Sequence, residues 1–160
     1  NYGVTPKSVC YINDGKGVFK LLPEAQAGPL TEAGMITGAV WMNLDSDKQK
    51  ELIVVGDWMA PRTFKFSGNK FIELNTNLST MHGWWQSVAS ADLDGDGDDD
   101  LVLGNLGENF YLKPDVKQPV KLWINAFSKS MMPEKIITRS INNKDVPVFL
   151  KRINIRWLIR

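Results

Sequence analysis

The amino-acid sequence predicts an all-β protein built from consecutive antiparallel strands. Its apolar runs are short, rich in β-branched and aromatic residues, and bounded by Gly, Asn, Asp or Pro, which is the pattern of strands separated by turns. Helical periodicity is nearly absent. A segment of the chain also recurs after a shift of 49 residues, so that Gly34 falls on Gly83, and the second copy contains the dense acidic stretch DLDGDGDDDL at 92–101.

The expected strands follow one another along most of the chain. They are SVCYI, GAVWM, ELIVVGDW, RTFKF, KFIEL, QSVASA, DLVLGN, VKLWINAF, EKIITR and VPVFL. Two segments between them, NDGKG at 13–17 and SGN at 67–69, are typical of hairpin turns, because Gly and Asn adopt positive φ at little cost. Short helical turns are expected only near LPEAQAG.

The internal repeat defines the expected structural unit. GAVWMNLDSDKQKELIVV (38–55) aligns with SVASADLDGDGDDDLVLG (87–104), and each copy is read as strand, polar loop, strand. Two further strands after the first copy complete a four-stranded unit of roughly 40–50 residues, the size of a propeller blade. We therefore expect a partial β-propeller of about two and a half four-stranded antiparallel blades: the end of one blade at 8–30, a full blade at 34–76 and a following blade at 83–150.

The acidic stretch has the spacing of a calcium loop. Calcium takes 6–8 oxygen ligands, and alternate carboxylates in a tight loop supply them. The expected ligands are the side chains of Asp92, Asp94, Asp96 and Asp100 and the backbone oxygen of Asp98, with Gly97 at the bend. An EF-hand is excluded because its twelfth position is Leu103, inside an apolar strand, where that loop needs Glu and a helix. The alternative is a solvated acidic turn.

The first copy keeps oxygen-bearing side chains at the corresponding positions. They are Asn43, Asp45, Asp47 and Glu51, with Gln49 offering its backbone oxygen. Lys48 replaces the glycine and adds a positive charge, so this copy is predicted as a weak second calcium site or as a hydrogen-bonded turn. A third copy starting at Asn125 has Phe127 and Lys129 where carboxylates are needed, and we expect it to bind no metal.

Several of these segments resemble a known family. ADLDGDGDDDLVLGN is similar to an FG-GAP repeat, also called a VCBS repeat, of the integrin-like β-propeller class. The resemblance extends over GMITGAVWMNLDSDKQKELIVVGDWMAPRTFKF, GWWQSVASADLDGDGDDDLVLGNLGEN and PVKLWINAFSKS, covering roughly residues 8–150. It implies calcium binding, a secreted or cell-surface location, and a role in adhesion or glycan handling within a propeller of more blades. Lys48 and NAFSKS depart from the family pattern.

Composition limits the other function classes. The net charge is +1, so nothing in it favours nucleic acid or a membrane surface, and no apolar run is long enough to span a bilayer. The single cysteine, Cys10, allows no internal disulfide and is expected to pack as a small apolar group. His82 has no nucleophile motif beside it and is expected to be structural. The chain begins at Asn1 without a visible signal peptide, and we expect it to be a fragment of a larger propeller.

The leading hypothesis is a non-catalytic calcium-binding module that binds a protein or glycan ligand or serves as a scaffold. One alternative is part of a polysaccharide lyase or hydrolase, in which Glu108 would act with Lys113 or Arg62; another is a subunit of an outer-surface assembly. Open blade edges would be covered by the parent chain or by another subunit. The aromatic residues of HGWW (82–85), Trp41, Trp58 and Trp123 suit either packing between blades, which we favour, or sugar stacking. The basic tail LKRINIRWLIR is expected to be a solvated edge or terminus.

Overall fold

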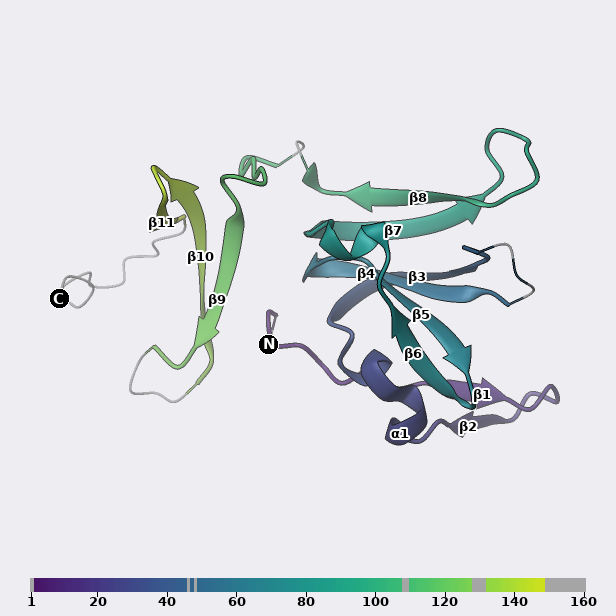
Figure 1. Cartoon of the computed structure of the whole chain (residues 1–160). Coiled ribbons are helices and arrows are strands. Elements are labelled where there is room, and N and C mark those ends of the chain that lie inside the picture. The colour runs from purple at the N-terminus through teal and green to yellow at the C-terminus, as the bar shows by residue number, and fades with distance from the viewer. Residues whose placement is uncertain (1, 46, 48, 108–109, 128–131, 149–160) are drawn as a thin grey trace. The chain divides into compact units, whose positions relative to one another are not determined.

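The computed structural model confirms the all-β class. It describes residues 2–45, 47, 49–107, 110–127 and 132–148, and the chain divides into two compact units at Leu106 and Gly107. Figure 1 shows antiparallel strands in both units and one short α-helix. Each unit is described by itself below.

The first unit opens with a two-stranded hairpin. Strand β1 (Tyr11–Asn13) pairs with β2 (Phe19–Leu21), and the predicted turn at 13–17 joins them. The side chain of Asn13 closes this turn by accepting the Gly15 amide at 2.9 Å. The strand predicted in SVCYI begins only at Tyr11. Cys10 therefore precedes it, half-buried against the core, where burial raises the pKa of its thiol.

Two helical turns follow, as LPEAQAG indicated. They are α1 (Glu24–Ala27) and the 3₁₀ turn η1 (Gly28–Glu32). Pro23 precedes α1, where its missing N–H costs no helical hydrogen bond. The turns carry small and apolar side chains, including Ala27 and Leu30, into the interior, where they cover the neighbouring strands.

The next four strands belong to a six-stranded antiparallel sheet, and the prediction that residues 34–76 form one blade stays a prediction. Strands β3 (Met35–Met42), β4 (Glu51–Met59), β5 (Arg62–Ser67) and β6 (Lys70–Leu74) pair in chain order. The β5–β6 turn holds Gly68 at φ 57° and Asn69 at φ 67°, which is the hairpin geometry expected from SGN. Within this sheet β4 is almost fully buried over Glu51–Gly56.

The first two strands of the repeat, β3 and β4, recur in the second copy. After the 3₁₀ turn η2 (Asn77–Thr80), β7 (Gly83–Ala91) pairs with β8 (Asp100–Asn105), and β7 also pairs with the end of β4. The Met42↔Glu51 pair recurs as Ala91↔Asp100. A register shift between positions 36 and 38 of β3 recurs between positions 85 and 87 of β7. The 49-residue repeat is therefore a repeat of structure, including its irregularity.

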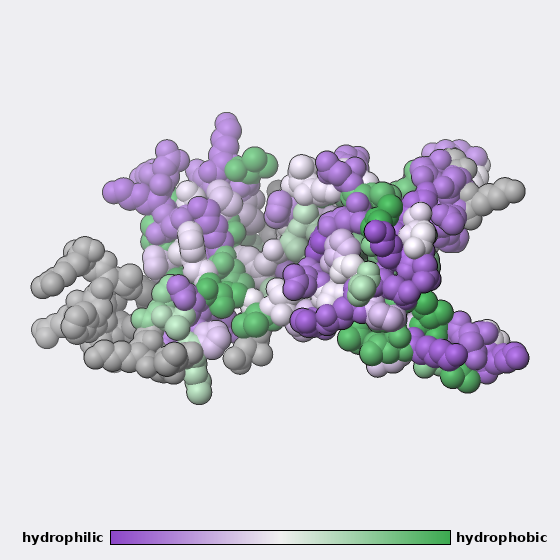
Figure 2. Space-filling view, turned by 60° about the horizontal axis from the view of Figure 1, so that its bottom comes forward, coloured by the Kyte–Doolittle hydropathy of each residue, from purple (hydrophilic) through white to green (hydrophobic). Residues whose placement is uncertain are grey.

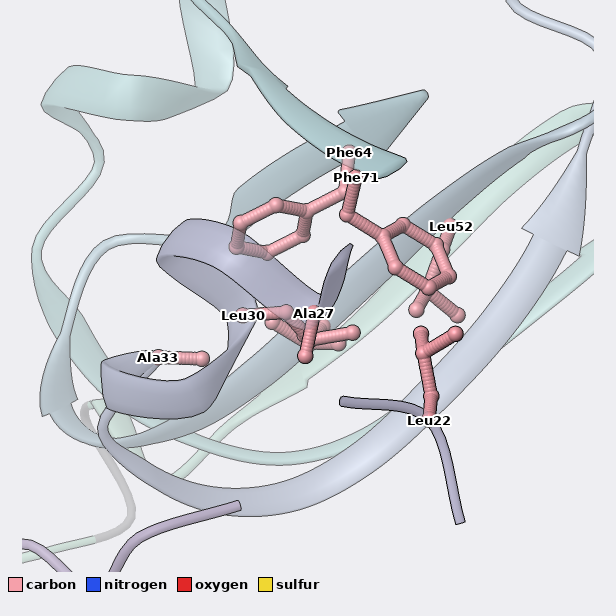
Figure 3. Close-up of a cluster of buried hydrophobic side chains, with 8 residues drawn as sticks. Leu22, Ala27, Leu30, Ala33, Leu52, Phe64 and Phe71 are labelled. Atoms are coloured by element: carbon pink, nitrogen blue, oxygen red, sulfur yellow. The ribbon is translucent and has the colours of Figure 1, made fainter. Parts of the chain in front are cut away.

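The core of this unit lies between the helical turns and the sheet. Figure 3 shows apolar side chains from both converging on Phe64 and Phe71. The cluster consists of Leu22, Ala27, Leu30, Ala33, Leu52, Val54, Phe64 and Phe71. Phe64 is fully buried, and burying such a side chain stabilises the fold by about 1.5–3 kcal/mol. Phe71 also meets Phe66 edge to face at 4.9 Å between ring centres.

The second unit is a three-stranded antiparallel sheet. Strands β9 (Val120–Asn125), β10 (Glu134–Ile141) and β11 (Lys144–Pro147) pair in the order β11–β10–β9, which agrees with the strands expected in VKLWINAF and EKIITR. Trp123 donates its indole N–H to Thr138 across β9 and β10 at 2.8 Å. The assignment of β1–β2 and of β7–β11 to particular blades stays a prediction. Among the described residues, the helices are too short to cross a bilayer.

Candidate metal-binding loops

The acidic loop of the second repeat joins two paired strands. Residues 92–99 connect β7 to β8 just beyond the Ala91↔Asp100 pair, and Figure 1 shows this loop extending past the strand ends. One carboxylate oxygen from each of Asp92, Asp94 and Asp100 lies within 4.8 Å of the other two. All three side chains are exposed. Three of the ligands predicted from the sequence therefore lie close together, and their binding of calcium stays a prediction.

Backbone amides fold the loop around these carboxylates. Asp92 accepts the amides of Gly95 at 2.7 Å and Gly97 at 3.1 Å, while Asp100 accepts the amide of Leu93 at 3.0 Å. Gly97 has φ 97°, a conformation that a residue with a Cβ rarely adopts, although the space around it is open. The glycine is therefore required by the bend itself. It turns the chain so that Asp92 and Asp100, at the two ends of the loop, meet.

The remaining predicted ligands are placed differently. Asp96 lies outside the group of three mutually close carboxylates, and its Oδ1 accepts the amide of Asp98 at 2.9 Å. Asp94 accepts the amide of Asp96 at 3.2 Å and so keeps one oxygen for the cluster. The donor set is carboxylate oxygen only, which suits a hard cation such as calcium. In the described part of the chain no Lys or Arg forms an ion pair with these aspartates.

The loop of the first repeat shares three side-chain-to-backbone hydrogen bonds with the second loop. Glu51 accepts the Leu44 amide at 3.1 Å, Asp45 accepts the Asp47 amide at 3.2 Å, and Asp47 accepts the Gln49 amide at 2.6 Å. Each of these bonds recurs 49 residues later in the second loop. Oxygens of Asp45, Asp47 and Glu51 also lie within 4.8 Å of one another. The two loops therefore share one backbone design.

A lysine distinguishes the two loops. Lys65 of β5 places its Nζ 3.0 Å from Asp45 Oδ2, 2.6 Å from Asp47 Oδ2 and 3.1 Å from Glu51 Oε1. Hydrogen bonds to Asp47 first, then to Asp45 and Glu51, raise the pKa of Lys65. The same hydrogen bond from Lys65, followed by that from the Gln49 amide, lowers the pKa of Asp47.

Sequence reasoning missed Lys65 because it considered only residues within the loop. Lys48, which drew attention instead, lies outside the described residues. The pairing of Leu52 with Phe64 places Lys65 at the next position of β5, beside Glu51 across the strand pair. A signal was present in RTFKF, where a lysine alternates with inward-facing aromatics, but its partner depends on strand register.

The aromatic residues are divided between packing and surface. Trp58 meets Trp84 edge to face at 4.5 Å, joining β4 to β7, which agrees with packing between repeats. Trp41 is half exposed above Phe71, and Trp123 is half exposed in the second unit. His82 lines an open pocket with Trp58, Arg62 and Glu73, among others.

The residues of the enzymatic alternative have structural roles or fall outside the description. Arg62 donates two hydrogen bonds to the Glu73 carboxylate, both at 2.6 Å, and a third to the Glu32 carbonyl at 2.7 Å. It therefore ties β5 to β6 and to η1. Glu108 lies outside the described residues, and Lys113 belongs to the other unit.

Comparison with known proteins bears on the repeat region. Residues 43–103, from the first acidic loop through the second, match the family model of the FG-GAP-like repeat. No match was found among curated proteins or among solved structures. FG-GAP repeats often bind calcium and are typical of extracellular or surface proteins. The matched segment, the repeated loops and the antiparallel sheets together support an FG-GAP-like repeat at residues 43–103, and they are consistent with part of a β-propeller.

Proposed function

We propose that this chain is a non-catalytic, calcium-stabilised propeller module of a secreted or cell-surface protein. It serves adhesion, binding of a protein or glycan, or scaffolding. The observation that carries the proposal is the cluster of Asp92, Asp94 and Asp100 at the end of the β7–β8 hairpin. The match to a repeat family that often binds calcium supports the same conclusion.

The physical role of the ion follows from the spacing of the charges. Two carboxylates 4.8 Å apart repel each other by about 0.9 kcal/mol even at the dielectric constant of water. A divalent cation converts this repulsion into attraction and joins the first and last residues of the loop. The hairpin end and the loops beside it then become ordered together. Millimolar extracellular calcium is sufficient for a site of modest affinity.

The first hairpin supports the proposal that neighbouring strands cover the open edges of the module. Both β1 and β2 are exposed along their length, and Tyr11, Phe19 and Leu21 are each more than half accessible to solvent. Figure 2 shows hydrophobic surface near this hairpin, beside its polar turn. We propose that the parent chain or another subunit covers it, because an open apolar edge invites non-specific pairing.

Thermal unfolding in calcium and in chelator tests the calcium proposal. We expect a higher melting temperature with calcium at about 5 mM, above the dissociation constants of roughly 10⁻⁴–10⁻³ M that are typical of extracellular calcium modules, than with excess EGTA, because an ion that binds only the folded state stabilises it. Magnesium at equal concentration serves as the control, since it demands near-ideal octahedral geometry and dehydrates reluctantly. Identical melting curves in calcium and EGTA would refute the proposal.

A further inference from the structure

We propose that the Lys65 ammonium takes the cation position of the first acidic loop, so that this repeat is closed by a cation of the protein itself. The inference concerns the loop at 43–51, and it rests on the proposed function only for the contrast with the second loop. In the first repeat the cation is covalently attached; in the second it is calcium from solution.

The contacts of Lys65 match those of a cation at the centre of a ligand set. Its Nζ lies within 3.1 Å of Asp45, Asp47 and Glu51 at once. These are the counterparts, 49 residues earlier, of Asp94, Asp96 and Asp100. An ammonium has three N–H groups, and three carboxylates surround it. The charge of one lysine therefore occupies the space between the carboxylates.

Burial makes this lysine necessary rather than incidental. Glu51 is fully buried, and the Lys65 side chain is 17% exposed. A buried carboxylate without a cation beside it is strongly unfavourable, because it has lost its hydration. In the second loop Asp100 is exposed and water can hydrate it. The first loop thus needs its cation at all times, whereas the second can exist with or without one.

One polar atom of the first loop is left unused by the lysine. Asn43 Oδ1 is buried and has no hydrogen-bond partner among the described residues. Asn43 stands where the second loop has Asp92, a member of the carboxylate cluster. Removing the ammonium would leave the carboxylates of Asp45, Asp47 and Glu51 within 4.8 Å of one another without a cation. Clustered carboxylate oxygens are the ligands that calcium prefers.

The two repeats therefore differ in whether their loop structure depends on calcium. The first loop is closed at every calcium concentration, and calcium does not compete for it because a metal would have to displace a tethered cation. The second loop responds to calcium. Within residues 43–103, one repeat is therefore permanently ordered and holds the strands against which the calcium-dependent repeat folds.

The test exchanges Lys65 in a chain whose second loop has been silenced by Asp92→Asn and Asp94→Asn. Lys65→Gln removes the ammonium, and Lys65→Arg is the matched control that keeps the positive charge. Each chain is unfolded thermally in calcium and in EGTA, and calcium binding is titrated by calorimetry. We expect calcium to change neither the melting temperature nor the binding heat of the silenced chain with Lys65 or of its Lys65→Arg variant. We expect Lys65→Gln to melt lower in EGTA and to recover in calcium, with one additional calcium bound per chain.

Two results would overturn the inference. One is a calcium response of the silenced chain with Lys65 in place that equals the response of Lys65→Gln. The other is a Lys65→Gln chain that loses no stability and binds no calcium. Because the second loop is silenced in every chain, a failure of the calcium proposal for that loop leaves this comparison intact.

A measurement on the unaltered chain applies even if Lys65→Gln does not fold. Brief acetylation at pH 8 followed by mass spectrometry compares Lys65 with Lys70, an exposed lysine on the adjacent strand β6. We expect Lys65 to be acetylated at least about tenfold more slowly than Lys70, in EGTA and in calcium alike, because its ammonium is held by three carboxylates and stays protonated. Equal labelling of the two lysines would contradict the inference.

Discussion

Replacement of Asp94 by Asn is expected to change the sign of its effect on stability when calcium is added. Asn keeps an Oδ1 that can accept the Asp96 amide, as Asp94 does at 3.2 Å, so the loop retains its internal hydrogen bond. The substitution removes one negative charge from the cluster of Asp92, Asp94 and Asp100. In chelator that charge only repels its neighbours, whereas in calcium it is a ligand.

The magnitude follows from the distances. Asp94 has two carboxylate neighbours within 4.8 Å, which gives about 1.7 kcal/mol of repulsion in unscreened water and about 1 kcal/mol after screening at physiological salt. Asp94→Asn is therefore expected to stabilise the calcium-free chain by up to about 1 kcal/mol, or roughly 4 °C for a unit of this size. With calcium at 100 times its dissociation constant, the wild type gains about 2.7 kcal/mol. A variant that no longer binds would then be less stable by about 1.7 kcal/mol.

The assay is urea and thermal unfolding of wild type, Asp94→Asn and Asp99→Asn, each in calcium and in EGTA. Asp99→Asn is a matched control because this substitution removes the same charge from the same exposed loop, at a position outside the ligand pattern. We expect Asp99→Asn to retain its calcium-dependent stabilisation and Asp94→Asn to lose it. Equal calcium responses of the two variants would refute the reasoning that Asp94 is a ligand.

Three further predictions concern the fold that supports the loops. Phe64→Ala should cost about 3–5 kcal/mol in urea unfolding, because the side chain is fully buried in the core; a loss below 1 kcal/mol would contradict that. Gly56→Ala should cost at least about 1–3 kcal/mol, because the added Cβ would lie 2.1 Å from the Met35 carbonyl oxygen, and amide exchange in β3 should speed up. The Arg62 hydrogen bonds lower the pKa of Glu73 in the folded protein. Their contribution to folding stability is therefore fully present above the pKa of about 4.3 that Glu73 has in the unfolded chain, and it is lost as pH falls through the lower pKa of the folded chain. Glu73→Gln should therefore flatten the loss of stability between about pH 5 and 3 by up to about 1 kcal/mol, the ordinary limit for a partly exposed pair; an unchanged pH profile would count against it.

The sequence by itself determined the features that depend on neighbours along the chain. The turns at 13–17 and 67–69 and the helical turns after Pro23 appear where the residues indicated them, whereas the strand expected in SVCYI begins only at Tyr11. The 49-residue repeat and the gathering of Asp92, Asp94 and Asp100 were also readable, because a loop of nine residues brings its own ends together. Local backbone preferences and short spacings decide such features.

Only the tertiary structure decided which distant groups share a space. Lys65 reaches the first loop because β5 pairs with β4 in one particular register, and a shift of one residue would turn the lysine to the other face. The same register buries Glu51, whereas its counterpart Asp100 remains exposed, although the two stand at equivalent positions of the repeat. Asp96 likewise satisfies the sequence pattern but lies outside the cluster. Strand register and burial arise from packing of the whole sheet. The sequence pattern of ligands in a single loop therefore specifies neither of them.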